Sequence, residues 1–276
     1  MQSKEVTSVL RLAVRGAVSA RDRDELAVEE PLEIRAEGPG QAPESISVTM
    51  RTPGHDLELA AGFLFTEGLV RSRDDLDPHP ARELAVVGGP ENVVTVRLRA
   101  PFDAERLKRN FYATSSCGMC GKASIDHIEV ASPPIAKGPI VPQRVLLQLQ
   151  PALRTAQSTF ERTGGLHATG AFTAEGALML MREDVGRHNA MDKVIGRLLL
   201  DRALPFSRGI LLASGRLSFE LVQKAAMAGV PILCAVSAPS SLAVRAAERL
   251  GMTLVAFLRD DGFNVYTHED RIRLDT

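Results

Sequence analysis

Apolar and polar residues follow two patterns along the chain, and the pattern changes near residue 140. Before that point, segments such as "SISVTM" (45–50) and "ENVVTVRLRA" (91–100) alternate apolar with polar side chains. Alternation with a period of two predicts half-buried β-strands, and further strands are predicted within the first 40 residues. One helix is predicted at 55–70, because Leu59, Phe63 and Leu64 fall on one helical face. The first half of the chain is therefore predicted to be mainly β.

After residue 140, apolar strand-like runs take turns with helix-like segments. Strands are predicted at 167–173, 176–184, 208–214, 230–237, 252–260 and 262–268. Helices are predicted at 142–165, with an interior proline at Pro151, and at 186–203, 217–229 and 241–251. Such alternation predicts an α/β fold with a mostly parallel sheet. The segment "SPPIAKGPIVP" (132–142) holds four prolines and marks a boundary. We predict a smaller, mainly β domain at 1–140 and an α/β domain at 141–276.

Composition and charge restrict the class of partner. The 33 basic and 34 acidic residues give a net charge of -1. The chain has no excess of positive charge, which binding to nucleic acid or to an acidic membrane surface would require, so we expect neither as a partner. The N-terminus has no secretory signal, and the longest uncharged run, 225–244, contains glycine and prolines and does not fit a membrane span. We expect a cytoplasmic protein, in which a disulfide framework is not favoured.

Polar loops follow four successive predicted strands, at 183–193, 214–220, 237–241 and 258–262. Ligands of α/β sheets bind at such strand ends, and helix N-termini suit phosphate. A single such loop is usually only a helix cap, but four together predict a nucleotide-like ligand. His188 is open to three interpretations: a general base, a ligand to phosphate or metal, or a structural histidine sharing a face with Asp192. The candidate contacts in these loops are Asp184, Arg187, His188, Asn189, Lys193, Ser214, Gly215, Arg216 and Ser237.

Two of the three cysteines, Cys117 and Cys120, lie in "TSSCGMCGK" (114–122). As a zinc site the pair needs two more ligands. Cys234 is expected to be buried in an apolar strand, and His127 and His167 stand alone. No structural metal is therefore expected within one chain, although a site shared between two chains stays open.

Two further interpretations of the cysteine pair involve reactive sulfur. A thioredoxin-like redox pair opens a helix, and Gly118 and Gly121 argue against a firm helix here. A sulfur-handling site needs an accessible thiolate near positive charge, which small neighbours and Lys122 provide. The order of strands and helices also fits a deaminase-like layer. However, "HATG" at His167 and the cysteine-free "REDVGRHNA" lack the deaminase metal and acid/base residues, so deamination is not expected.

Several segments together resemble the FdhD family of sulfur carriers required for formate dehydrogenase activity. They are "TPGHDLELAAGFLFTEGLV", "SSCGMCGK", "ATGAF", "REDVGRHNAMDKVIG", "SGRLSFELVQKAAMAGVPILCAVSAPSSLAV" and "VYTH". The resemblance runs from about residue 45 to residue 268. It implies a cytoplasmic homodimer whose C-terminal domain is cytidine-deaminase-like and lacks the deaminase metal site.

The resemblance also implies a reaction. A cysteine desulfurase gives a persulfide to Cys117, with Cys120 assisting. The sulfur then passes to the Mo or W of a bis(molybdopterin guanine dinucleotide) cofactor destined for formate dehydrogenase. The family's cofactor segment maps onto Phe257, Leu258, Arg259, Asp260, Asp261 and Gly262. Asp260 and Asp261 depart from what this segment needs, because two carboxylates repel a phosphate-rich ligand. The backbone and Arg259 are therefore expected to make the contact.

Two other functions compete with sulfur transfer. One is a cofactor-binding chaperone without catalytic activity, in which the cysteines are structural. The other is a zinc protein with a site at Cys117 and Cys120 shared across a dimer. A guanine nucleotide such as GDP is expected to bind weakly, as a fragment of the cofactor.

Overall fold

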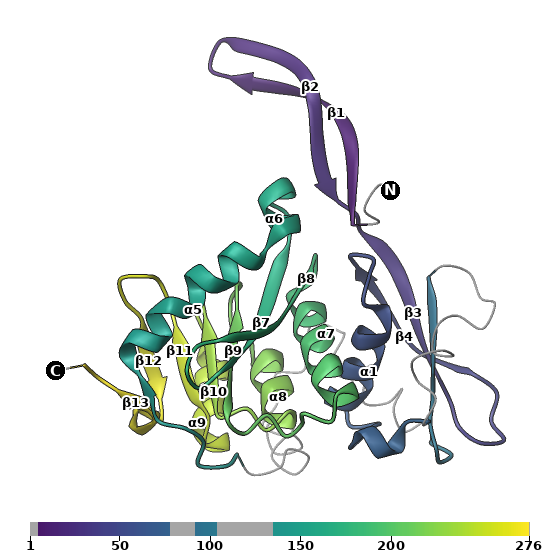
Figure 1. The fold of residues 1–276 in the computed structure, drawn as a ribbon. Helices are drawn as coiled ribbons and strands as arrows, with labels where there is room; N and C mark the ends of the chain where they lie inside the picture. Colours follow the sequence, from purple (N-terminus) through teal and green to yellow (C-terminus); the bar gives the residue numbers. More distant parts are fainter. Residues whose placement is uncertain (1–4, 78–91, 104–134, 276) are drawn as a thin grey trace.

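The computed structural model describes residues 5–77, 92–103 and 135–275. Figure 1 shows a body of helices and sheets from which a two-stranded ribbon projects. The ribbon consists of β1 (Val6–Arg15) and β2 (Val18–Ala27), paired antiparallel over their full length. Gly16 forms its turn with φ 61, a left-handed conformation that glycine adopts without strain. We call this ribbon the arm.

A three-stranded sheet follows the arm, in the order β4-β3-β5. It contains β3 (Glu30–Glu37), β4 (Glu44–Arg51) and β5 (Val93–Arg97). Alternate residues of β3, namely Leu32, Ile34 and Ala36, are fully buried. They face α1 (Asp56–Thr66), which the sequence predicts over a longer range, and a short helix η1 (Arg73–Asp75) follows. The predicted strand-rich first half is thus confirmed for the described residues.

A six-stranded sheet forms the second half, in the order β12-β11-β10-β9-β7-β8. Its strands are β7 (His167–Thr173), β8 (Leu178–Asp184), β9 (Gly209–Ala213), β10 (Ile232–Ala235), β11 (Thr253–Ala256) and β12 (Asn264–Thr267). β10 is parallel to β9 and β11, whereas β7 is antiparallel to β8 and β9, and β12 is antiparallel to β11. The mixed α/β class is confirmed, but the expectation of a mostly parallel sheet is wrong.

The antiparallel pairs have a simple cause. The turn 174–177 joins β7 to β8 and the loop 257–263 joins β11 to β12, in both cases without a helix. A strand that returns directly after a turn runs antiparallel to its predecessor, whereas a crossover helix makes the next strand parallel. β7 then lies between β8 and β9, so two strands joined by a helix are separated by an antiparallel strand.

Helices cover both faces of the six-stranded sheet. α5 (Gln143–Ala156), which contains Pro151 as predicted, and the short α6 (Ser158–Thr163) belong to one side. α7 (Arg187–Leu200), α8 (Phe219–Met227) and α9 (Ser241–Leu250) cover the other. Ile210 and Leu212 of β9 pack on the α5 side, and Leu211 packs on the side of α7. This alternation along one strand produces two cores.

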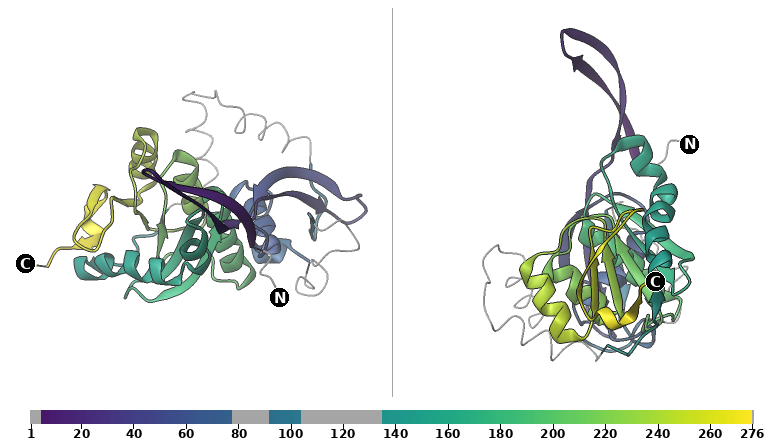
Figure 2. Two further views of the ribbon diagram at one scale, coloured as in Figure 1. Left: turned by 90° about the horizontal axis from the view of Figure 1, so that it is seen from above. Right: turned by 90° about the vertical axis from the view of Figure 1, so that its left-hand side faces the viewer.

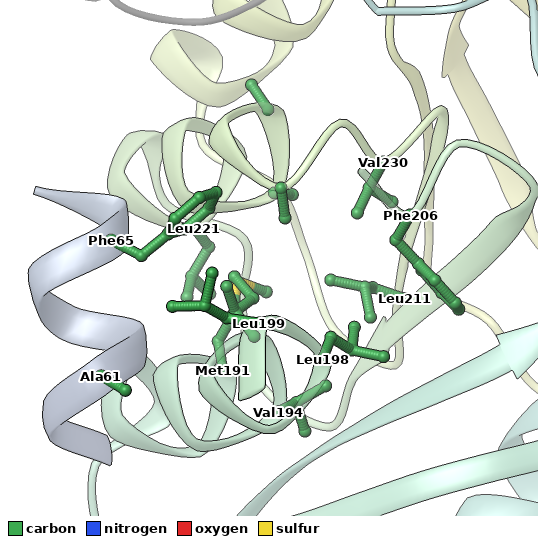
Figure 3. Packing of buried hydrophobic residues seen from close by; sticks show 14 of the residues in the cluster. Ala61, Phe65, Met191, Val194, Leu198, Leu199, Phe206, Leu211, Leu221 and Val230 are labelled. Carbon is green, nitrogen blue, oxygen red and sulfur yellow. The ribbon is translucent and has the colours of Figure 1, made fainter. Parts of the chain in front are cut away.

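The larger core extends across residue 140. In Figure 3, the side chain of Phe65 of α1 extends toward Leu221 of α8, and Ala61 of α1 lies on the side that faces α7, which contributes Met191 to the same cluster. The same cluster includes the buried face of the three-stranded sheet. The division into two domains at residue 140 stays a prediction, and the structure adds that a helix from each side of it contributes to one core.

Two short elements complete the fold. β6 (Val141–Pro142) pairs in parallel with β13 (Ile272–Arg273), next to η2 (Glu269–Arg271). Among the described residues, none of the helices combines the length and the apolar character needed to cross a membrane.

Candidate functional site

The polar loops of the six-stranded sheet meet at one end of it. β8, β9, β10 and β11 end there, and β7 and β12 begin there. Backbone hydrogen bonds join the loops: Leu217 N donates to Ala238 O at 3.1 Å, and Phe257 N donates to Ser237 O at 3.3 Å. Segments 214–220, 236–241 and 257–262, together with Arg187 and His188 at the start of α7, thus form one surface, which we call the strand-end ledge.

Three of the predicted ligand contacts lie beneath the ledge. Asp184 and Lys193 form a buried ion pair in which Lys193 Nζ lies 2.7 Å from Asp184 Oδ2. Gly186 N and Asn189 Nδ2 donate to Asp184 Oδ1 at 2.8 and 3.1 Å, and Thr52 N donates to Asp184 Oδ2 at 3.2 Å. Buried charges persist when pairing and hydrogen bonds satisfy them. Asp184, Asn189 and Lys193 therefore fix the start of α7 with polar atoms that are already engaged.

Arg187, His167 and Gly215 meet on the ledge. Gly215 approaches so closely that a Cβ there would lie 3.1 Å from His167 Nδ1 and 3.7 Å from Arg187 Cδ. The Nε atom of Arg187 is buried and has no hydrogen-bond partner in the described part of the chain. A buried donor without a partner is costly, and each such donor calls for an explanation. Arg187 therefore offers the ledge a positive charge and a free donor.

Both histidines of the ledge have a lowered pKa. Burial lowers the pKa of His167, and the positive charge of Arg187 lowers it further. Burial, followed by Arg187, lowers the pKa of His188 to about 4. His188 is therefore neutral at pH 7, and its Nε2 forms a hydrogen bond with Ser218 Oγ at 3.3 Å. Its contact with Glu220 Oε2, at 4.0 Å, is not an ion pair at that pH.

The remaining predicted ligand contacts of the first three loops differ in whether their polar atoms are free to bind a ligand. Ser214 continues the sheet: its Oγ accepts from Ala168 N at 2.8 Å, and its own N donates to Ala168 O at 2.9 Å. Arg216 is exposed, while Ser237 is half-buried. Arg216 is thus free to add positive charge beside Gly215, whereas Ser214 shapes the ledge.

Phe257 stands out in the last loop of the ledge. It adopts φ 54, in the left-handed region that a bulky residue rarely occupies. Its side chain is an exposed large apolar group, with 43% of the residue accessible. The next residue, Leu258, is fully buried in the smaller core and anchors the turn. An aromatic ring held out from a strand end in this way is a platform on which a nucleic base can stack.

The turn after Phe257 is closed by Arg259. Arg259 N donates to Gly262 O at 2.8 Å, and its guanidinium donates to the carbonyl oxygens of Val236 and Leu258. Asp260 and Asp261 are both exposed at the tip. Arg259 therefore stabilises the loop through backbone oxygens, and the two carboxylates face solvent.

A second buried charge cluster lies between the ledge and α1. Lys224 Nζ donates to Asp192 Oδ2 and Thr66 Oγ1 at 2.9 Å each and lies 3.3 Å from Glu67 Oε1. Burial lowers the pKa of Lys224, but the two carboxylates outweigh it and raise that pKa overall. Asp192 thus belongs to the core contacts between helices, although it is four residues from His188.

The cysteines divide into two groups. Cys117 and Cys120 lie outside the described residues. Cys234 lies in β10 and is fully buried, as expected, and burial raises the pKa of its thiol. A buried thiol of this kind is unreactive. Within the described ranges, no group of three or more His, Cys, Asp or Glu side chains is arranged to hold a metal ion.

His167 is the member of the site that sequence reasoning missed. It stands alone in its segment, and its neighbours on the ledge come from residues 187 and 215. It reaches them because β7 begins where β8 and β9 end, a consequence of its antiparallel direction. The apolar pattern of β7 does not specify that direction.

The ledge is suited to an anionic ligand. α7 and α8 both begin there, so the N–H groups of their first turns carry partial positive charge at the site, and at the start of α8 the Glu220 carboxylate already accepts hydrogen bonds from Ser218 and from its own backbone. Neither helix has a side-chain hydrogen bond at its N-cap. Arg187 adds a full charge, and the neutral histidines add none of their own. Phosphate or another oxyanion matches this combination.

Comparisons with known proteins agree over most of the chain. The sequence model of the FdhD/NarQ family matches residues 27–273. The sulfur carrier protein FdhD of Mycolicibacterium paratuberculosis is 50% identical, covering 97% of this chain and 99% of that protein. That of Streptomyces avermitilis is 51% identical, covering 94% of this chain and 92% of that protein. That of Sulfurisphaera tokodaii is 42% identical, covering 97% and 99%.

A solved structure is similar over the same extent. It is the crystal structure of a putative formate dehydrogenase accessory protein from Desulfotalea psychrophila. The two chains superpose with a TM-score of 0.76 at 26% sequence identity, covering 97% of this chain and 99% of that chain.

Proposed function

The chain belongs to the FdhD/NarQ family, and on that premise we propose that it is a sulfur carrier serving formate dehydrogenase. The observation that carries the proposal is its 50% identity, along 97% of its length, with a protein named as a sulfur carrier. The similar solved structure, named as a formate dehydrogenase accessory protein, supports the choice of partner.

In the proposed reaction, the thiolate of Cys117 attacks the terminal sulfur of a persulfide on a cysteine desulfurase. A new S–S bond forms on Cys117, and the desulfurase cysteine leaves as a thiolate. Cys120 then attacks the Sγ of Cys117, which forms a disulfide between the two cysteines and releases the terminal sulfur as sulfide to the acceptor. A thiol reductant restores the pair.

The proposed acceptor is the Mo or W of a bis(molybdopterin guanine dinucleotide) cofactor, bound as a substrate on the strand-end ledge. Arg187, with its unpartnered Nε, is assigned to a phosphate, and exposed Arg216 adds charge beside it. Phe257 is assigned to a guanine ring. Asp184, Asn189 and Lys193 act indirectly by fixing the start of α7. GDP serves as a fragment ligand.

We also propose that the six-stranded layer is related to cytidine deaminases without retaining their chemistry. Zinc deaminases hold their metal with histidine and cysteine and use a glutamate as general acid/base. Here the starts of α7 and α8 bring together His188 and Ser218, with a hydrogen bond of 3.3 Å between them. The segment after β9, 214–220, contains no cysteine. A cytoplasmic homodimer is the proposed setting.

Mass spectrometry of the intact protein tests sulfur transfer. The chain is incubated with a cysteine desulfurase and labelled cysteine, with and without subsequent reductant. The wild type should gain one labelled sulfur that reductant removes, whereas Cys117→Ala should gain none. Cys234→Ala is the matched control: because that thiol is buried, the variant should be labelled like the wild type. A wild-type protein without label overturns the proposal.

Cofactor binding and metal analysis of the same protein distinguish sulfur transfer from the two competing functions. An unlabelled chain that still binds the cofactor supports the chaperone. Metal analysis that finds about one zinc for each two chains, lost in Cys120→Ala, supports a zinc site shared across a dimer.

A further inference from the structure

Thr52 belongs to the first half of the chain, yet its polar groups bond to the segment that begins α7. Thr52 N donates to Asp184 Oδ2 at 3.2 Å, and Val185 N donates to Thr52 Oγ1 at 3.2 Å. Thr52 O accepts from Lys193 Nζ at 2.9 Å. The N–H, the carbonyl and the hydroxyl of Thr52 are thus all engaged by residues at least 132 positions later in the chain.

The residues just before Thr52 add to this contact. Asn189 Nδ2 donates to Met50 O at 2.7 Å, and Thr49 Oγ1 donates to Asn189 Oδ1 at 3.3 Å. The left view of Figure 2 shows the three-stranded sheet at one side of the molecule, with α1 against α7. The end of β4 is therefore joined to the start of α7 by hydrogen bonds, in addition to the packing of α1.

Thr52 is held firmly on its own side of this contact. The preceding residue, Arg51, is 2% exposed and donates to both carboxylate oxygens of Asp56, at 3.0 and 2.9 Å. Arg51 Nη2 also donates to Asn92 Oδ1 at 3.0 Å. A guanidinium that pairs with a carboxylate through two hydrogen bonds fixes the geometry of both groups. The following residue, Pro53, has a restricted φ. Thr52 is thus a rigid support.

The start of α7 lacks a cap of its own. Its N-cap residue is Gly186, which has no side chain to accept a hydrogen bond. A Cβ at Gly186 would lie 3.1 Å from Asn189 Nδ2 and 3.4 Å from Asp184 Oδ1, so a side chain there would crowd these contacts. Thr52 Oγ1 and Asp184 Oδ1 instead accept from the N–H groups of residues 185 and 186. Thr52 therefore supplies an acceptor that Gly186 cannot supply.

Arg187 is the residue whose position this arrangement decides. Its Nε is buried and has no hydrogen-bond partner among the described residues, so no acceptor holds that atom. Its neighbours Gly186 and Asn189 both donate to Asp184 Oδ1, while Thr52 donates to the other oxygen of the same carboxylate. The backbone that carries Arg187 is thus fixed from both sides. A side chain that is fixed before a ligand arrives binds it more tightly, because less conformational freedom is lost.

We propose that Thr52 is a positioning residue for the strand-end ledge, which fixes the start of α7 so that Arg187 is ready to bind an anionic group. Thr52 is 2% exposed and lies beneath the ledge, so it acts through Arg187 without touching the ligand. This role rests on the proposed function, in which Arg187 binds a phosphate of the substrate. It makes ligand binding at the second half of the chain dependent on a residue of the first half.

Titration of the full chain with inorganic pyrophosphate tests this role, with the ring C–H signals of His167 and His188 followed by nuclear magnetic resonance. Thr52→Val keeps the shape of the side chain and removes Oγ1, so Val185 N loses its acceptor. The dissociation constant of pyrophosphate should rise roughly three- to tenfold, as expected when one hydrogen bond is lost. Thr52→Ser retains the hydroxyl and should stay within about twofold of wild type.

A second readout needs no ligand. Burial, followed by the charge of Arg187, lowers the pKa of His188 to about 4. A loosened start of α7 weakens both effects, so Thr52→Val should raise the pKa of His188, and Thr52→Ser should restore the wild-type value. A purely structural loss of stability does not move the pKa of a side chain in the folded state.

Thr253→Val is the matched control. Thr253 is fully buried, its Oγ1 donates to His268 O at 2.7 Å, and that oxygen accepts from Arg271 at 3.1 Å. It begins β11 at the end of the sheet opposite the ledge. Thr253→Val should therefore lower the midpoint of urea unfolding, while the affinity for pyrophosphate and the pKa of His188 stay as in wild type.

The results distinguish a failure of this role from a failure of the proposed function. Where wild type binds pyrophosphate, an equal affinity of Thr52→Val, or an equal loss in Thr253→Val, overturns the positioning role. A wild type that does not bind pyrophosphate contradicts the assignment of Arg187 to phosphate, and an unchanged pKa of His188 in Thr52→Val then overturns the role by itself. If Thr52→Val does not fold, Thr49→Val, which removes the half-buried hydrogen bond to Asn189, gives the same test.

Discussion

Gly62 of α1 and Gly196 of α7 lie face to face where the two helices cross. A Cβ added to Gly62 would lie 1.9 Å from Asp192 O, and one added to Gly196 would lie 1.8 Å from Glu58 O. Both obstacles are main-chain atoms, which cannot swing aside as a flexible side chain can. The missing side chains therefore allow the helices to touch along their backbones.

Gly62→Ala should destabilise the fold through this crossing. Forcing the helices apart disturbs the cluster to which Ala61 and Phe65 of α1 belong, which Figure 3 shows. Overpacking of a core typically costs about 1–3 kcal/mol, and we expect at least the upper end of that range because the backbone must move. Urea unfolding measures the loss. Gly165→Ala is the control, because a Cβ added there would lie 3.9 Å from its nearest neighbour. Equal urea midpoints for Gly62→Ala and wild type would contradict this close backbone contact between α1 and α7.

Glu58 should make the protein sensitive to acid. Burial raises the pKa of Glu58, but hydrogen bonds from His55 and Arg182 outweigh it and lower that pKa to about 2, from 4.5. The folded state thus binds its proton less readily than the unfolded state. The stabilisation is complete above pH 4.5 and is lost as pH falls towards 2.

The measurement is urea unfolding of Glu58→Gln and wild type at several pH values. The variant loses the paired hydrogen bonds to Arg182, at 2.6 and 2.9 Å, and should be less stable by roughly 2–3 kcal/mol at pH 7. The difference should shrink as pH decreases below 4.5. Asp201→Asn, which breaks an exposed ion pair with Arg197, should cost under about 1 kcal/mol. A difference independent of pH would refute this assignment.

The imidazole of His188 should titrate far below neutrality. Burial and Arg187 hold its pKa at about 4 instead of 6.5. Between these values the unfolded state binds the proton more readily, so His188 lowers stability as pH falls from 6.5 to 4. Nuclear magnetic resonance of the ring C–H groups gives the value directly. Arg187→Gln removes the nearby positive charge and should raise the pKa of His188, while burial keeps that pKa below 6.5. A wild-type pKa of 6.5 would show that the ring is solvated.

Guanine nucleotides should bind to the ledge through Phe257 and Arg187. Base stacking on an aromatic ring contributes about 1–3 kcal/mol, so Phe257→Ala should weaken GDP binding roughly tenfold or more. Arg187→Ala should weaken GDP and ADP alike, because it acts on phosphate. Titration calorimetry compares the two nucleotides, with Met179→Ala, an exposed residue of β8, as the control. Equal affinity for GDP and ADP would remove guanine from the assignment.

The helices of the second half were predictable because their apolar residues repeat at helical spacing. Residues 186–203 predict a helix, and α7 occupies Arg187–Leu200. The neighbours of each strand were not predictable in the same way. Buried strands such as β7 and β9 carry similar apolar runs, and nothing local to such a run specifies which strand lies beside it. The position of β7 between β8 and β9, and hence that of His167, needs the tertiary structure.

Burial of charged residues limited the prediction of the site. Asp184 and Lys193 have the charge expected of ligand contacts, and charged side chains are rarely buried unless they are paired. Their pairing depends on a turn of α7 and on Thr52, which is 132 residues away from Asp184. The spacing of residues along one helix cannot indicate such a partner. Arg187, which lies between Asp184 and Lys193 in the sequence, is the charged side chain of this segment that reaches the ledge.

The contact between α1 and α7 has a consequence for synthesis on the ribosome. Thr66 and Asp192, which share a hydrogen bond at 2.9 Å, are 126 residues apart. At about 5–20 residues per second, α1 emerges roughly 6–25 seconds before its partner. During that interval its apolar face has no helix to cover it, and a nascent chain in this condition is a substrate for chaperones. The first half of the protein therefore completes its folding only after most of the chain has been translated.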